Sequence, residues 1–334
     1  MLYDVPIEPL EERYTKQWHG WYADAFDAHN VPWERIHGET ITDRVQHGGT
    51  FLDAIGTNVY KSSQLTALCK KAAIGLLKDG DIVFVHDLWF PGLQMLAYIR
   101  DAMQLKFKIY GCLHAGIYDP WDFLAQAKMH SWGLPFEKSI LEMIDGAFLA
   151  TEFHKRLILE THPGYEHKLH VTGFPIFPPK VGDYEQQQRS PNSIVFPHRI
   201  VPEKHPEKFD TLASQLGKDW SCTKSQSTRR TKKEYHELLL RSAVAVSFAE
   251  QETWGIAMQE AVFCGCIPFV PDRLSYVEMF PWPLRYTSED DLISKIRHYN
   301  DFQQPAAKAC KYLMGCGAAA INNMLSGMEW WVFK

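Results

Sequence analysis

The feature that most constrains the fold of this chain is a regular alternation of short apolar runs with segments of helical periodicity. In the first half the apolar runs stand at Leu2–Val5, Asp81–His86, Lys108–His114, Gly146–Ala150 and Leu169–Thr172. Runs that are apolar on both faces are typical of strands buried in a parallel sheet. Because helical segments separate them, they predict βαβ units, and the expected fold class is α/β. One such segment, Ser62–Leu77, is expected to begin at its two serines, whose hydroxyls can cap a helix.

The alternation is interrupted once and then resumes. The stretch from Gly173 to Pro191 is rich in Pro, Gln and Gly, a composition typical of interdomain linkers. Strand patterns follow it at Ser193–Pro197, Ala243–Phe248 and Ile267–Val270, again with helical segments between them. The second half therefore predicts a second set of βαβ units.

Length and composition narrow the class of protein. At roughly 150 residues per domain, a chain of 334 residues is expected to hold two domains. Hydrophobic residues make up 46% of it, enough for two packed cores, which excludes a globally disordered protein. We expect two Rossmann-like domains, at residues 1–175 and 190–305. A helical segment at 306–334 is expected to pack back on the first domain.

Three features bear on the compartment. The seven cysteines, an odd number without regular spacing, are typical of reduced thiols in the cytosol. The first residues, MLYDVPIEPLEERY, are acidic where a signal peptide is basic and then apolar. The uncharged run Tyr312–Met328 is interrupted by glycines and asparagines, so it predicts a packed helix rather than a membrane span. We expect a cytoplasmic protein with no membrane partner.

An acidic loop followed by a predicted helix, within residues 247–270, is the strongest chemical signal. The helix is expected to span Trp254–Cys264, so Trp254, Gly255 and Ile256 stand at its start. Free amides and the helix dipole at such a start favour an anion, for example a diphosphate. Glu252 lies just before this start and Glu260 lies about two turns into the helix. Carboxylates there could accept hydrogen bonds from sugar hydroxyls, so the pattern predicts a nucleotide-sugar site.

A cationic pair stands in a second loop that follows a predicted strand. Arg199 and Lys204 come after the strand that ends at Pro197. Arginine offers a planar fork and lysine a point charge, a suitable pair for a diphosphate. Both loops belong to the carboxyl ends of strands, where ligands gather in open α/β sheets.

Together these residues resemble the retaining GT-B glycosyltransferases of the glycogen-synthase and sucrose-synthase superfamily. Glu252 and Glu260 match the E-x7-E signature of that family, and Gly265–Pro268 matches its Gly-x-x-Pro pattern. Arg199 and Lys204 match its Arg-x4-Lys pair. The resemblance implies two Rossmann-like domains facing each other across a cleft, and a hexosyl- or pentosyltransferase activity.

The resemblance also implies a role for each matched residue. Arg199 and Lys204 would hold the diphosphate, Glu260 the donor ribose and Glu252 the transferred sugar, while His114 would border the reaction centre. The implied catalytic residues are therefore His114, Glu252, Lys204 and Arg199. The implied donor-binding residues are Arg199, Lys204, Trp254, Gly255, Ile256 and Glu260.

The chemistry implied by the family is front-face displacement with retained anomeric configuration. The donor would be a UDP- or GDP-sugar, and the leaving phosphate would help to deprotonate the acceptor without a metal. Asp79 and Asp81 form a D-x-D pattern, but they stand at the start of a strand, so we read them as a turn. The chain departs from the family at Pro6–Glu12, where a Gly-rich loop is common, so donor contacts from the first domain are in doubt.

The acceptor is less constrained. Glu11–Trp18, Asp87–Gly92 and Ala150–His154 resemble phage-encoded glycosyltransferases that modify hydroxymethylated pyrimidines in DNA. This implies a DNA partner, a base flipped from its stack, and a place in the host cytoplasm. The net charge of −5 favours instead a small molecule, a glycan or an RNA base. A catalytically silent GT-B module is a third alternative.

Three further segments have two interpretations each. The basic segment Lys218–Lys233 is either a solvated loop or a set of phosphate contacts. Trp18, Trp21 and Tyr22 are expected to be core rather than an acceptor platform. Tyr118–Asp122 either lines the acceptor site or forms an ordered turn.

Overall fold

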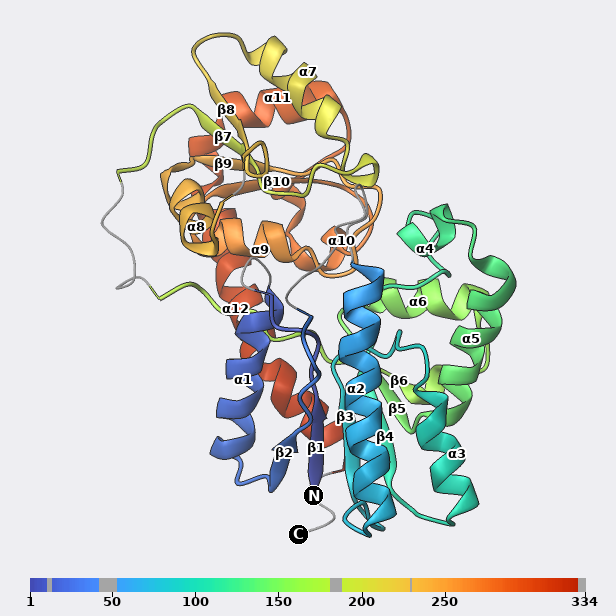
Figure 1. Cartoon of the computed structure of the whole chain (residues 1–334). Coiled ribbons are helices and arrows are strands. Elements are labelled where there is room, and N and C mark those ends of the chain that lie inside the picture. The colour runs from blue at the N-terminus through green and yellow to red at the C-terminus, as the bar shows by residue number, and fades with distance from the viewer. Residues whose placement is uncertain (11–13, 42–52, 181–187, 229, 330–334) are drawn as a thin grey trace. The chain divides into compact units, whose positions relative to one another are not determined.

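The computed structural model describes residues 1–10, 14–41, 53–180, 188–228 and 230–329 and divides into two units, shown in Figure 1. The first unit consists of Met1–Leu149, Leu157–Thr172 and Ile321–Lys334, and the second of Ala150–Arg156 and Gly173–Ala320. Each contains one sheet in which every pair of neighbouring strands is parallel. The predicted α/β class is confirmed.

The first unit has a six-stranded sheet with the order β2-β1-β3-β4-β5-β6. Its elements are β1 (Leu2–Val5), α1 (Tyr14–Ala28), β2 (Trp33–Arg35), α2 (Ala54–Ala73), β3 (Ile82–Val85), α3 (Gln94–Ala102), β4 (Lys108–Cys112), α4 (Phe123–Gln126), α5 (His130–Met143), β5 (Gly146–Leu149) and β6 (Leu169–Val171). Helix α6 (Glu152–Thr161) passes from the second unit into the first.

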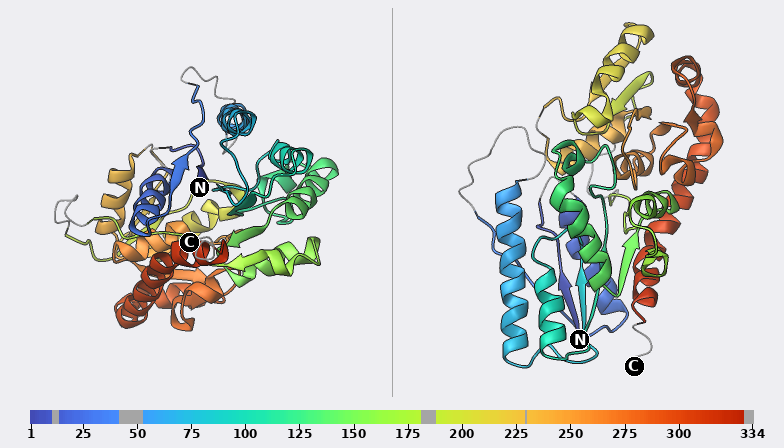
Figure 2. Two further views of the ribbon diagram at one scale, coloured as in Figure 1. Left: turned by 90° about the horizontal axis from the view of Figure 1, so that it is seen from below. Right: turned by 90° about the vertical axis from the view of Figure 1, so that its right-hand side faces the viewer.

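Helices cover both faces of this sheet, as Figure 2 shows. On one face α1 packs through Tyr22, whose ring lies 5.4 Å from that of Phe84. The Tyr22 hydroxyl donates to Sδ of Met324, 3.4 Å away. Helices α2, α3 and α5 pack against the other face, where Val83 and Val85 are buried. Because helices cover both faces, successive residues of each strand are buried, and the strands are continuous apolar runs in the sequence.

The second unit has a five-stranded sheet with the order β11-β10-β9-β7-β8. Its elements are β7 (Ser193–Phe196), a 3-10 turn at Pro202–Lys204, α7 (Pro206–Leu216), β8 (Ser221–Lys224), α8 (Lys232–Arg241), β9 (Val244–Val246), α9 (Ile256–Phe263), β10 (Ile267–Pro271), α10 (Tyr276–Met279), β11 (Arg285–Tyr286), α11 (Glu289–Arg297) and α12 (Gln303–Gly327). The last residues of α12 belong to the first unit.

One helix begins elsewhere than the sequence predicted. Helix α2 begins at Ala54 and not at Ser62, because Asp53 is its cap and accepts a hydrogen bond from the Gly56 amide at 3.0 Å. Within the helix the hydroxyl of Ser63 donates to the Tyr60 carbonyl oxygen at 2.8 Å. A serine can therefore lie inside a helix by bonding to its backbone, and the pair was wrongly read as a start.

Two further points concern the aromatic residues of α1 and the length and hydrophobicity of the helices. Trp18 and Tyr22 are buried in the first unit, as predicted, whereas Trp21, the third residue expected in the core, is only half-buried. Over the ranges that the structure describes, no helix joins enough length to enough apolar character to cross a bilayer.

Candidate functional site

The loops that follow β7 and β9 meet at the carboxyl edge of the second sheet. The two strands are hydrogen-bonded neighbours, so their loops leave the sheet side by side. The Glu250 amide in one loop donates to the Glu203 carbonyl oxygen in the other at 2.9 Å. The two sequence signals of this half of the chain therefore converge at the edge where parallel sheets bind ligands.

Lys204 and Glu252 form the centre of this edge. Lys204 Nζ lies 3.3 Å from Glu252 Oε2 and also donates to the carbonyl oxygen of Gln251. The two side chains are only 6% and 15% exposed. Burial raises the pKa of the Glu252 carboxyl, but Lys204 and His198 lower it further than burial raises it. The net pKa lies below the ordinary value, so Glu252 is an anion at neutral pH.

His198 and Arg199 lie next to this pair. Burial, followed by the positive charge of Lys204, lowers the pKa of His198 to about 3, so its imidazole is neutral at pH 7. Its Nε2 is buried and has no hydrogen-bond partner in the described part of the chain. Arg199 is 30% exposed, with Nη2 3.8 Å from Glu203 Oε1. His198 was not predicted, although it directly precedes Arg199 in the sequence.

Glu260 has partners that the sequence did not reveal. Helix α8 supplies Lys232, which forms an ion pair with Glu260 Oε1, and His236, whose Nε2 lies 3.6 Å from the same oxygen. Burial raises the pKa of Glu260, but these two partners outweigh it and bring the pKa to about 2. Lys232 and His236 are spaced i, i+4 and so share a helix face, which is the signal that could have found them.

The basic segment containing Lys232 thus has more than one role. Its residue Lys232 belongs to the site, whereas Lys224 pairs with Asp210 at 2.7 Å on the surface. Arg229, another of its cations, lies outside the described residues.

The start of helix α9 is shaped by a glycine. The helix begins at Ile256, and Gly255 precedes it with φ of +54°. A Cβ on Gly255 would lie 3.1 Å from carbon atoms of Tyr276 and Met279. Glu252 Oε1 accepts the Gly255 amide at 2.8 Å, so a carboxylate occupies part of the expected anion site. Trp254 is 6% exposed, and its ring lies 3.5 Å from where a Cβ on Gly173 would be.

Of the predicted site residues, His114 alone belongs to the first unit. It follows β4, and its Nε2 lies 2.8 Å from the His86 carbonyl oxygen. A carbonyl oxygen only accepts, so Nε2 carries the proton. Its ring is 5.1 Å from that of Trp18. Burial lowers the pKa of His114, which keeps the imidazole neutral at pH 7.

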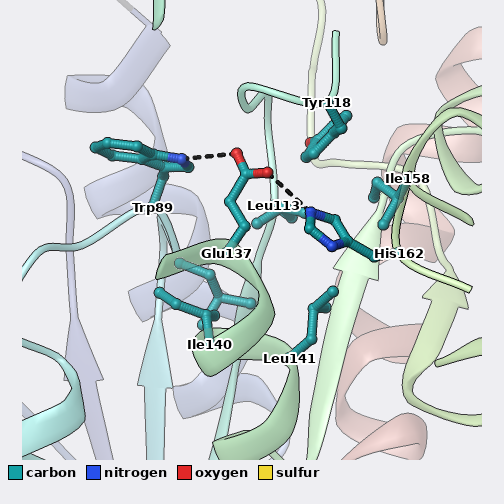
Figure 3. Close-up of a pocket in the computed structure, with 9 residues that line it drawn as sticks. Trp89, Leu113, Tyr118, Glu137, Ile140, Leu141, Ile158 and His162 are labelled. Carbon is teal, nitrogen blue, oxygen red and sulfur yellow. Dashed lines mark hydrogen bonds and ion pairs between the residues drawn. The ribbon is translucent and has the colours of Figure 1, made fainter. Parts of the chain in front are cut away.

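A buried carboxylate near the same sheet edge lines a small cavity, shown in Figure 3. Glu137 on α5 accepts the indole N–H of Trp89 at 3.0 Å, and its other oxygen lies 3.0 Å from His162 Nε2. It also accepts the Ile117 amide at 2.5 Å. The cavity holds about 10 Å³, at the lower limit for one water molecule. It is therefore too small for a nucleotide sugar.

The D-x-D pattern forms the predicted turn. Asp79 Oδ1 accepts the Lys106 amide at 2.9 Å, and Asp81 Oδ2 accepts the Lys78 amide at 2.8 Å. Among the residues that the structure describes, no group of three His, Cys, Asp or Glu side chains could hold a metal ion.

No family model matches the chain. It is 33% identical over 100 residues to the tRNA-queuosine alpha-mannosyltransferase of Drosophila melanogaster. The aligned segment is 30% of this chain and spans 25% of that protein.

The structure is similar over its whole length to several solved glycosyltransferases. Sucrose-phosphate synthase from Thermosynechococcus elongatus matches with a TM-score of 0.71 and 11% identity, over 100% of this chain and 99% of that one. Anabaena HepE, solved with UDP and glucose, matches with a TM-score of 0.60, 10% identity and the same coverage. A trehalose-6-phosphate synthase matches with a TM-score of 0.56 and 12% identity, over 99% of this chain and 98% of that one. The chain therefore has the GT-B fold of these glycosyltransferases, as its sequence predicted.

Proposed function

We propose that this protein is a retaining glycosyltransferase that moves a sugar from a nucleotide-diphosphate sugar to a hydroxyl acceptor. The observation that carries the proposal is the buried Lys204–Glu252 pair at the carboxyl edge of the second sheet, with Arg199 beside it. A nucleotide sugar has a diphosphate that needs cations and sugar hydroxyls that need acceptors. At this edge a cation, Lys204, and a hydrogen-bond acceptor, Glu252, lie within hydrogen-bonding distance of each other.

Each donor contact has a physical rationale. Lys204 and Arg199 hold the diphosphate and stabilise its charge as it leaves. Glu252, an anion, accepts from hydroxyls of the transferred sugar. The buried and unpartnered Nε2 of His198 supports a polar ligand here, because an unsatisfied buried polar atom is costly.

The nucleoside part of the donor has its own proposed contacts. Glu260 accepts from the ribose hydroxyls, and Lys232 holds its carboxylate ionised and oriented. Gly255 and Ile256 place the start of α9 beside the phosphates, where its dipole favours an anion, although the Gly255 amide itself donates to Glu252. The buried Trp254 supports this turn from within.

The proposed reaction needs no resident cofactor. The bond between the anomeric carbon and the diphosphate oxygen breaks, and the acceptor oxygen forms its bond to that carbon on the same face. The acceptor proton passes to the departing phosphate oxygen. The protein contributes positioning and charge stabilisation. His114, neutral with its proton on Nε2, borders the transferred sugar without adding a charge.

For the acceptor we propose a hydroxyl on a modified base of a nucleic acid in the cytoplasm. Two versions have separate support. The likeness to a tRNA-queuosine alpha-mannosyltransferase favours a modified tRNA nucleoside and a mannosyl donor. The segments Asp87–Gly92 and Ala150–His154 favour a hydroxymethylated pyrimidine in phage DNA. The first is the better supported, because it rests on an alignment of 100 residues.

A transfer assay with labelled donors tests both versions. Labelled UDP-glucose, UDP-N-acetylglucosamine and GDP-mannose are each mixed with queuosine-containing tRNA, hydroxymethylated DNA and their unmodified counterparts. Label on a modified acceptor and not on its counterpart is the expected result. Nucleotide binding without transfer to any acceptor would indicate a silent binding module and contradict the enzyme proposal. A positive signal must be absent in the Lys204→Ala variant.

A further inference from the structure

The loop and helices that follow β4 form an exposed surface that the donor site does not use. Residues 116–140 leave the carboxyl end of β4, where His114 lies, and run through α4 and most of α5, which ends at Met143 (Figure 1). Three large aromatic side chains of this segment are exposed: Trp121 at 44%, Phe123 at 43% and Trp132 at 48%. Exposed apolar side chains that gather in one patch mark interaction sites.

The acidic and basic side chains of residues 116–140 differ in exposure. Its three acidic residues, Asp119, Asp122 and Glu137, are all buried. Asp119 Oδ1 accepts the Trp121 amide at 2.9 Å, and Asp122 Oδ1 caps α4 through the Leu124 amide at 2.9 Å. The ionisable side chains it exposes are those of Lys128, His130 and Lys138. Up to residue 140 the segment thus presents cations and aromatic rings outward and buries its carboxylates. Glu142, in the last turn of α5, is exposed and accepts the Tyr165 hydroxyl at 2.5 Å.

The ring of Trp132 packs against side chains that are themselves held in place. The ring of Trp132 lies 5.6 Å from that of Trp89 in an edge-to-face arrangement. Trp89 is held by its indole hydrogen bond to Glu137, which Figure 3 shows. Close packing of α5 on the loop also requires Gly133, because a Cβ there would lie 2.9 Å from Ile117. A surface anchored in this way loses little conformational entropy when a ligand stacks on it.

We propose that the α4–α5 surface, formed by Trp121, Phe123, Trp132, Lys128 and Lys138, binds unpaired nucleotides that flank the acceptor base of a nucleic acid. Aromatic side chains stack on bases without regard to sequence, and lysines neutralise the phosphates. Charge complementarity selects this occupant, because the exposed Lys128 and Lys138 outnumber Glu142, the one exposed carboxylate of α4 and α5, and a nucleic acid supplies anions. The assignment rests on the proposed function for its acceptor, while the binding it describes is measured without sugar transfer.

Binding of a labelled oligouridylate of about 16 nucleotides tests the surface directly. In the Trp121→Ala/Trp132→Ala double variant each lost stack is expected to weaken affinity about 10-fold, giving about 100-fold together. Two exposed aromatics elsewhere provide matched controls, Tyr98 on α3 at 76% and Trp282 in the second unit at 58%. Their alanine variants are expected to stay within about 2-fold of wild type.

The lysines are tested through the salt dependence of binding. The Lys128→Gln/Lys138→Gln variant is expected to lower the slope of log affinity against log salt by about 0.7 per lysine. Thermal unfolding of every variant identifies any that fail to fold. Should the double tryptophan variant misfold, the lysine variant alone decides the question.

The outcomes separate this inference from the proposed function. Unchanged oligouridylate affinity in both folded double variants would overturn the inference, whatever the transfer assay shows. A change in self-association in place of RNA affinity, measured by sedimentation, would assign the surface to a second copy of the chain and also overturn it. If the variants lose RNA affinity but the wild type binds neither UDP nor GDP, the surface assignment holds and the glycosyltransferase proposal fails.

Discussion

The two units each bury an ionised carboxylate, but with different partners. In the first unit both side-chain oxygens of Asp4 are used, by His86 Nε2 at 2.5 Å and by Arg35 Nε at 2.7 Å. Asp4 and His86 are fully buried. In the second unit Glu260 is 8% exposed and its cation Lys232 is 21% exposed. Each carboxylate has a buried histidine and a longer cation as partners, but Lys232 beside Glu260 is 21% exposed whereas Arg35 beside Asp4 is 13% exposed.

This difference indicates what each carboxylate does. Asp4 lies on β1, one strand in from the edge of the sheet, where it pairs in register with Arg35 and Phe84 on neighbouring strands. Asp4 and His86 are fully buried, so we expect the role of Asp4 to be structural. Lys232 and Glu260 are both partly exposed, at 21% and 8%, and in the proposed function Lys232 holds this carboxylate ionised while it accepts a ligand hydroxyl. A structural carboxylate should therefore matter for stability, and a functional one for binding.

The largest expected effect is on stability in the first unit. Replacing Asp4 with Asn removes the charge that compensates Arg35, and breaking a buried pair in this way costs about 3–5 kcal/mol. Urea denaturation at pH 7 measures the loss. The exposed Asp24 on α1 is the matched control, and Asp24→Asn is expected to change the free energy of unfolding by less than about 0.5 kcal/mol. An equal effect of both substitutions would remove the distinction between the units.

The pH dependence of this effect has a definite sign. Burial raises the pKa of Asp4, but His86 and then Arg35 lower it more, so the folded-state pKa is below the ordinary value. The stabilisation that ionised Asp4 contributes is therefore fully present at pH values above the unfolded-state pKa of about 4. It is lost as the pH falls through the lower folded-state pKa. The difference in free energy of unfolding between wild type and Asp4→Asn should narrow only in that acid range. If the difference disappears nearer neutral pH, Asp4 is not the buried anion described here.

The next effect is on catalysis in the second unit. Lys204→Ala removes the buried cation proposed to stabilise the leaving diphosphate, and kcat is expected to fall about 100- to 1000-fold. Lys218→Ala, at an exposed site of the same unit, should leave kcat unchanged. Steady-state kinetics with the donor identified in the transfer assay make the comparison. Similar kcat values for the two variants would mean that Lys204 does not contact the diphosphate.

Substitution of Glu260 should affect nucleotide affinity more than folding stability, the reverse of what we expect for Asp4. In Glu260→Gln the proposed ribose contact loses its charge, and hydrogen bonds to charged groups contribute about 1.5–3 kcal/mol. Nucleotide affinity is therefore expected to fall by at least about 10-fold, with a smaller loss of folding stability than in Asp4→Asn. Calorimetric titration and urea denaturation of the same preparations test this. A large stability loss with unchanged nucleotide affinity would make Glu260 a structural carboxylate like Asp4.

The smallest expected effect concerns the turn before α9. Gly255 and Gly75 both have positive φ, of +54° and +71°, but a Cβ on Gly75 meets nothing within 4 Å. Alanine at either site should cost about 1–2 kcal/mol from backbone strain alone. Gly255→Ala should lose more, because its Cβ would lie 3.1 Å from Tyr276 and Met279. Equal losses in urea denaturation would show that the neighbouring side chains accommodate the methyl group.

Sequence patterns were sufficient for the fold because most strands are buried on both faces. The strands that carry the sheets, such as β3 and β7, are continuous apolar runs. Strand β8 was missed, since Ser221–Lys224 is a polar strand at the sheet edge. Helix α5 was missed because Pro135 lies within it.

The candidate site was only partly predictable. Lys204 was singled out by its Arg-x4-Lys spacing from Arg199, and Glu252 by its E-x7-E spacing from Glu260. The structure brings Lys204 and Glu252 to 3.3 Å. His198 and Lys232 were missed because their importance depends on burial and on contacts between distant segments. For His198 they leave no pattern within a single stretch of sequence, whereas for Lys232 the i, i+4 spacing from His236 was the one local signal.

The central claim is that the carboxyl edge of the second sheet binds a nucleotide diphosphate. Calorimetric titration of UDP and of GDP into the wild type and into Lys204→Ala tests it most directly. The account predicts that one nucleotide binds the wild type and that its affinity falls about 100-fold in the variant, in line with the loss of a buried charge-assisted contact. Equal affinity in the two proteins, or no binding of either nucleotide to the wild type, would contradict it.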